Sequence, residues 1–171
     1  MSAARQAPRA DAPDRTRPIS PGSARSLSPF ALPTTEARLI DSKQLAALAA
    51  HIAEQKKGVD IRVLDVQEQI QIADYFVVVC GLSRPQLRAL HKELHIRLKE
   101  SGAGREHTEG VELGWWILMD FGDVVVHLMQ PEAREYYDLD GLYRDCPELE
   151  WRKVVLPELP AKDAARVRAA E

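Results

Sequence analysis

The sequence is poor in cysteine, has no long apolar run and carries little excess charge. Only two cysteines, Cys80 and Cys146, occur in 171 residues, which excludes a disulfide framework and favours a reducing, cytoplasmic setting. The apolar runs 75–80 and 115–119 fall far short of the roughly 18 to 20 residues that a membrane-spanning helix needs. With 23 basic and 26 acidic residues the formal charge is −3, which argues against broad binding of nucleic acid through its phosphates. A basic partner is therefore expected rather than an acidic one.

Residues 1–33 differ in composition from the rest of the chain. They hold six of the eleven prolines and five arginines, with few apolar side chains. Such a segment buries too little surface to offset the entropy of ordering it, so we expect a disordered tail. An organelle transit peptide is the alternative, although Asp11 and Asp14 disfavour it. The remaining residues carry a formal charge of −6, and we expect one domain at 34–150 and a C-terminal extension at 151–171.

Apolar spacing and capping residues predict an alternation of helices and strands. Asp41 and Gln44 have the spacing of a helix-capping box, and Ser83 stands where it would cap a second helix. Residues 101–114 are glycine-rich and are interpreted as a flexible connection. The predicted order is helix 41–57, strand 60–66, strand 75–80, a helix after Ser83, strand 115–120, strand 123–130 and helix 131–142. This order predicts a small mixed-sheet α/β sandwich with about four strands flanked by helices.

The strands 115–120 and 123–130 are predicted to form a hairpin around a two-residue turn, Phe121-Gly122. One face would then be wholly apolar and form the core, with Trp115, Ile117 and Met119 opposite Leu128, Val126 and Val124. The other face would pair Trp116 with His127, Leu118 with Val125, and Asp120 with Asp123. An aromatic anchor with acids at its rim is typical of a protein-binding surface. In the alternative interpretation a helix covers Trp116 and the acids are solvated turn residues.

Residues that suggest catalysis or metal binding do not form a complete site. His91 and His95 are four residues apart, but the zinc-protease pattern needs glutamate where Lys92 stands. Gly81-Leu82-Ser83 is similar to the start of a nucleotidyltransferase site, yet the paired carboxylates of such enzymes do not follow. Ser83 is interpreted as a helix cap. We therefore predict no enzymatic activity, no metal and no cofactor, and keep a nucleotidyltransferase-like enzyme as an alternative.

Three stretches stand out together: 74–83, the block W-I-L-M-D-F-G-D-V-V-V-H at 116–127, and 134–142. In combination they resemble one family, the ribosomal silencing factors, also called the Iojap-like family. The resemblance implies an α/β fold related to nucleotidyltransferases but without their catalytic groups. It also implies that the protein binds a protein on the intersubunit face of the large ribosomal subunit. The small subunit would then be blocked sterically from joining, which lowers translation when nutrients are short.

The resemblance also implies which residues bind the partner. They are Trp116, Leu118, Asp120, Asp123, His127, Tyr137 and Leu139. The apolar side chains would supply contact area, and the two aspartates would meet lysine or arginine. Arg134 stays open between a minor contact with rRNA or a partner acid and an internal pair with an acid such as Asp123, which is favoured. Trp115, where family members usually have a polar residue, and Tyr143, where they have tryptophan, depart from the pattern. A homodimer of the free protein through the hairpin face is kept as a further alternative.

Overall fold

The structure is a computed structural model and describes residues 40–157. The predicted tail, 1–33, and the end of the predicted extension lie outside the described residues. The elements are α1 (Ser42–Gln55), β1 (Val59–Asp65), β2 (Tyr75–Cys80), α2 (Arg84–Glu100), β3 (His107–Glu109), β4 (Trp116–Asp120), β5 (Val124–Met129), α3 (Pro131–Tyr137), α4 (Leu139–Leu142) and the 3-10 helix η1 (Trp151–Lys153).

The strands form one mixed sheet in the order β1-β2-β5-β4-β3. Strands β2 and β5 are parallel, and the other neighbours are antiparallel. The predicted α/β sandwich is confirmed, but the sheet has five strands rather than four. The fifth, β3, lies in 101–114, which we had interpreted as a flexible connection. Its three residues are polar and are exposed or half-buried, so the sequence shows no apolar alternation that would predict a strand. The strand forms because it pairs with β4 at the edge of the sheet.

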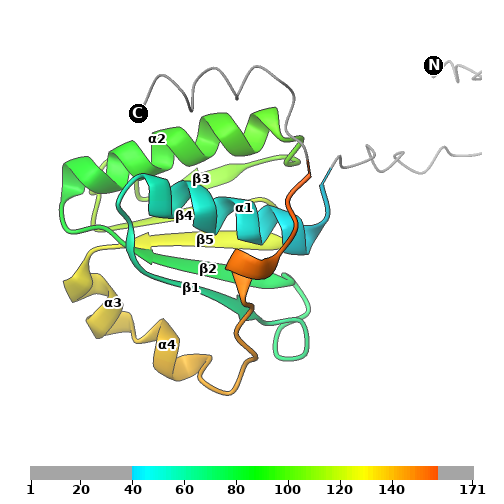
Figure 1. The fold of residues 1–171 in the computed structure, drawn as a ribbon. Coiled ribbons are helices and arrows are strands. Elements are labelled where there is room, and N and C mark those ends of the chain that lie inside the picture. Colours follow the sequence, from blue (N-terminus) through cyan, green and yellow to red (C-terminus); the bar gives the residue numbers. More distant parts are fainter. Residues whose placement is uncertain (1–39, 158–171) are drawn as a thin grey trace, which may run out of the picture. The chain divides into compact units, whose positions relative to one another are not determined.

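Helices α1 and α2 cover one face of the sheet, which we call the first face (Figure 1). Both helices begin as predicted. The Asp41 side chain accepts from the Gln44 backbone N–H at 2.7 Å, and the Ser83 hydroxyl accepts from the Gln86 N–H at 3.3 Å. Their buried sides are apolar, and they contribute Leu45, Leu48, Ile52, Leu87, Leu90, Leu94 and Leu98 to the core. Trp151, in the predicted extension, is 4% exposed in this core, so packing continues beyond residue 150.

Helices α3 and α4 lie on the opposite, second face of the sheet (Figure 1). They are short, and the two are separated by Asp138, whose φ of 43° is left-handed. The buried cluster here is smaller and includes Phe76, Val78, Met129 and Leu139. Partly buried aromatic side chains, Trp115, Trp116 and Tyr143, pack around it. The outer layer of the second face therefore consists of aromatic side chains that are partly exposed to solvent.

Candidate functional site

The β4–β5 hairpin differs in register from the predicted one. Leu118 pairs with His127 and Asp120 with Val125, so the predicted pairs, including Asp120 with Asp123, are wrong by two residues. The turn lies one residue later than predicted, at Gly122-Asp123, because Phe121 continues the pairing of the two strands. The Phe121 N–H donates to the Val124 carbonyl at 2.9 Å, and the side chain is 1% exposed in the first-face core. A shift of two residues keeps each side chain on its face, so Ile117 and Met119 do lie in the core while Trp116 and Leu118 lie on the second face.

Trp115 does not pack in the core as predicted. It precedes β4, so the alternation of the strand does not extend to it. Its ring centroid lies 6.2 Å from that of Tyr136 and 5.7 Å from that of Tyr137, both on α3. Tyr137 also contacts Trp116, with centroids 4.7 Å apart. Two adjacent tryptophans at the start of β4 thus pack against two adjacent tyrosines of α3.

We call Trp115, Trp116, Tyr136 and Tyr137 the aromatic surface. Tyr136 is 76% exposed and Tyr137 is 43% exposed, while the two tryptophans are half-buried. Leu118, half-buried, lies on the same face of β4 as Trp116. The prediction from the sequence placed Trp115 in the core and did not single out Tyr136. The adjacent pairs Trp115-Trp116 and Tyr136-Tyr137 were the signal that could have indicated them.

His127 and Leu139, both predicted to contact a partner, lie beneath this surface. His127 is 4% exposed and Leu139 is 9% exposed. The His127 ring lies between those of Phe76, 4.8 Å away, and Trp116, 5.8 Å away. Burial lowers the pKa of His127 to about 4, so the imidazole is neutral at pH 7. In this conformation both residues support the aromatic surface from below.

The two predicted acids lie at the β4–β5 connection. Asp120 is half-buried, and its Oδ1 accepts from the Gly122 N–H at 2.7 Å. Asp123 is exposed, and its backbone carbonyl accepts from the N–H groups of Asp74 and Tyr75 at 2.7 and 3.1 Å. Asp120 therefore fixes the turn, while Asp123 presents a carboxylate to solvent at the end of the sheet.

Arg134 makes an internal ion pair, as favoured, but with Asp140 rather than with Asp123. Its Nε and Nη2 donate to the two carboxylate oxygens of Asp140 at 2.7 and 3.0 Å. Arg62 of β1 donates to Asp140 at 2.7 Å and to Glu148 at 3.1 and 3.2 Å. The hydrogen bond from Arg134 lowers the pKa of the Asp140 carboxyl. We call the ion pairs of Asp140 with Arg134 and Arg62 the clasp, and it joins α3 and α4 to the β1 edge of the sheet.

The two histidines of α2 face a single carboxylate. His95 Nδ1 lies 2.5 Å from one oxygen of Glu106, and His91 Nε2 lies 3.9 Å from the other. Within residues 40–157, no group of three or more histidine, cysteine, aspartate or glutamate side chains is arranged to hold a metal ion. Burial lowers the pKa of His91. The hydrogen bond between His95 and Glu106 joins α2 to the segment before β3.

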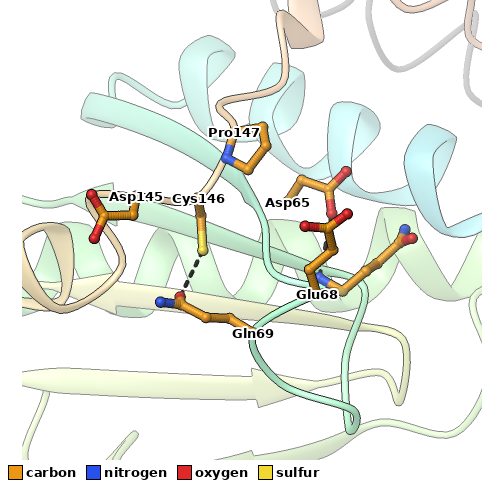
Figure 2. Close-up of a pocket in the computed structure, with 7 residues that line it drawn as sticks. Asp65, Glu68, Gln69, Asp145, Cys146 and Pro147 are labelled. Carbon is orange, nitrogen blue, oxygen red and sulfur yellow. Dashed lines mark hydrogen bonds between the residues drawn. The ribbon is translucent and has the colours of Figure 1, made fainter.

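A cavity of about 360 Å³ lies between the β1–β2 connection and the segment 145–147 (Figure 2). Cys146 points into it and donates from Sγ to the Gln69 side-chain oxygen at 2.8 Å. Burial and the carboxylates of Asp65 and Asp145 raise the pKa of this thiol, which disfavours the nucleophilic thiolate. The seven described residues that line the cavity include no histidine to act as a base. The described lining residues therefore give the Cys146 thiol no histidine base to activate it.

The described helices also bear on membrane association. Between residues 40 and 157, none is long and apolar enough to cross a bilayer.

Comparisons with known proteins converge on one family. Residues 39–171 match the family model described as "Ribosomal silencing factor during starvation". A ribosomal silencing factor, RsfS, from Chromobacterium violaceum is 38% identical over 104 residues, which cover 61% of this chain and 85% of that protein. RsfS from Bacillus subtilis is 34% identical over 108 residues, 63% of this chain and 92% of that one. A crystal structure of a Chromobacterium violaceum protein matches with a TM-score of 0.59 at 37% identity, over 61% of this chain and 88% of that chain.

Proposed function

Because the chain belongs to the ribosomal silencing factor family, we propose that it represses translation by binding the large ribosomal subunit at its intersubunit face. A protein of that face would contact the aromatic surface, and the bound domain would sterically block the small subunit. Repression would operate in the cytoplasm when nutrients are limiting.

The observation that carries the proposal is the aromatic surface. Large aromatic side chains supply much of the energy of protein interfaces, and here four of them adjoin one another with Tyr136 76% exposed. Asp123 lies exposed at the end of the same strand pair. It would meet lysine or arginine of a basic ribosomal protein and steer the encounter.

We propose that Arg134 has an internal role rather than the contact with rRNA that the sequence left open. Its guanidinium is engaged by Asp140, and its Nη1 donates to the Asp60 carbonyl. Only 12% of its side-chain surface is exposed. Binding is therefore proposed to rest on protein contacts.

A subunit-joining experiment tests the function directly. Purified small and large subunits are mixed with and without the protein and separated on a sucrose gradient. We expect fewer joined ribosomes and co-sedimentation of the protein with the large subunit. Unchanged joining with the protein at the top of the gradient contradicts the proposal.

Variants locate the surface. Trp116→Ala should abolish co-sedimentation, because it removes the central ring of the aromatic surface, while circular dichroism shows an intact fold. Val155→Ala is the matched control, since Val155 is 82% exposed on the segment after η1. A folded Trp116→Ala protein with wild-type affinity would overturn the assignment of the surface.

The same surface favours a homodimer of the free protein, because it leaves apolar aromatic area open to solvent. A dimer through Trp116 would compete with the ribosome for one surface. Light scattering of the wild type and Trp116→Ala separates the two cases, since only a dimer through this surface dissociates on substitution.

A further inference from the structure

Three polar atoms of the second face are buried without a hydrogen-bond partner among the described residues. They are Nε1 of Trp116 and both ring nitrogens of His127. Buried polar groups in folded proteins are nearly always paired, because an unpaired one loses its bond to water without replacement. Three such atoms on two adjoining rings therefore call for an explanation.

The two rings adjoin each other, and Tyr137 packs on the Trp116 ring. Their centroids are 5.8 Å apart, and the Tyr137 ring lies 4.7 Å from that of Trp116. Tyr137 is 43% exposed and is the last residue of α3, directly before the left-handed Asp138. It is the most exposed of the three rings and lies at the junction of two short helices. A change of its side-chain rotamer would uncover the Trp116 ring, against which His127 lies.

The unpaired atoms define the chemistry that would satisfy them. The indole Nε1 only donates, whereas a neutral imidazole has one donor and one acceptor. An ammonium group only donates, so it leaves the indole unpaired. A carboxylate only accepts, so it leaves one imidazole nitrogen unpaired, and it would approach residues 34–171, whose formal charge is −6. An amide has both a carbonyl acceptor and an N–H donor in one plane.

We infer that Trp116 and His127 form a latent hydrogen-bonding site, covered by Tyr137 in the free protein, that receives an amide group of the protein partner. The amide is a backbone peptide or the side chain of asparagine or glutamine. This inference rests on the proposed function, because the partner is the one bound at the aromatic surface. His127 is then a binding residue despite its burial.

Substitutions at His127 separate this role from a structural one. His127→Leu has a similar volume and no polar atom, so it should raise the melting temperature by relieving the unpaired nitrogens. It should also weaken binding to purified large subunits about tenfold, the effect of losing roughly one hydrogen bond at 1.4 kcal/mol per decade. His127→Gln retains a donor and an acceptor, so it should be less stable than the wild type yet bind better than His127→Leu.

The decisive result is thus that the more stable variant, His127→Leu, binds more weakly than the less stable variant, His127→Gln. If affinity follows stability across the three proteins, His127 is structural and the inference is wrong. Should His127→Leu fail to fold, His127→Met provides the apolar side chain with more freedom to fit. Wild-type protein that does not bind large subunits overturns the proposed function as well, whereas wild-type binding with unchanged affinity in the apolar variant overturns this inference alone.

Cryo-electron microscopy of the wild type on the large subunit identifies the group. We expect Tyr137 turned aside and an amide oxygen of a protein within about 3.2 Å of Trp116 Nε1. A nucleobase, a carboxylate or only water at that position contradicts the amide, as does Tyr137 still lying over Trp116.

Discussion

The two faces of the sheet differ in how completely helices cover them. The first face is closed by two long helices, and its cluster is apolar throughout, with leucines of α2 such as Leu87 and Leu90 fully buried. The second face is covered only by short helices and retains unpaired polar atoms beneath half-exposed aromatic rings. The difference indicates that the first face supplies most of the buried core, while the second carries the surface that we propose binds a partner.

The largest effect on stability is expected on the first face. Leu90→Ala removes a fully buried side chain of α2 and should cost about 3 kcal/mol of unfolding free energy, because it leaves a cavity. Denaturation in urea measures the loss. Leu113→Ala, at a position 74% exposed, is the control and should change stability by less than about 0.5 kcal/mol. A Leu90→Ala protein as stable as this control would contradict the division between the faces.

On the second face, His127 should make stability depend on pH. Its pKa is lowered by burial from 6.5 to about 4, so the unfolded chain binds the proton first as the pH falls. The free energy of unfolding is therefore unaffected by this group above pH 6.5 and decreases by about 3 kcal/mol in total as the pH falls to 4. Urea denaturation between pH 7 and pH 4 should show this loss in the wild type.

His127→Leu is the control for that pH dependence, because it has no titrating group at this position. The carboxyl of Asp140, with its pKa lowered by Arg134, loses its contribution only below its ordinary value of 3.8, outside this window. Parallel curves for the wild type and His127→Leu between pH 7 and pH 4 would show that His127 is not buried as a neutral group.

The same contrast explains which features the sequence could predict. The spacing of apolar residues correctly predicted which side of α2 packs on the first face. Leu87, Leu90, Leu94 and Leu98 repeat at helical spacing, and all four are buried. The run 75–80 was read correctly as a strand buried on both faces. The face of Trp116 also followed from alternation, which survives an even shift of register.

What the sequence could not predict depends on contacts between distant segments. The hairpin register was missed because Phe121 packs in the core and pairs with Val124, so the turn falls at Gly122-Asp123 rather than at Phe121-Gly122. The partner of Arg134 was missed because Asp140 is positioned by the left-handed residue Asp138 between α3 and α4. The meeting of Trp115 with Tyr136 depends on how α3 packs beside the start of β4, which no local pattern encodes.

The clasp that holds α3 and α4 should have an intermediate effect. Asp140→Asn removes the charge that faces both Arg134 and Arg62, and we expect a loss of about 2 kcal/mol, typical of hydrogen bonds to charged groups. Asp145→Asn is the matched control, since its carboxylate is 84% exposed and 4.0 Å from Arg144. Thermal denaturation of the two variants measures the difference, and equal melting temperatures would show that the clasp does not stabilise the second face.

The smallest effect on stability is expected where the effect on binding is large. Tyr136 is 76% exposed, so Tyr136→Ala should change unfolding free energy by less than about 0.5 kcal/mol. It nevertheless removes an outer ring of the aromatic surface, and co-sedimentation with large subunits should weaken severalfold. Leu82→Ala, on the β2–α2 connection and 67% exposed, should leave both quantities unchanged. Neither substitution disturbs a core. A loss of binding in Tyr136→Ala alone would therefore show that this exposed ring contacts the large subunit without contributing to the stability of the fold. Equal binding by both variants would confine the contact to Trp116 and its immediate neighbours.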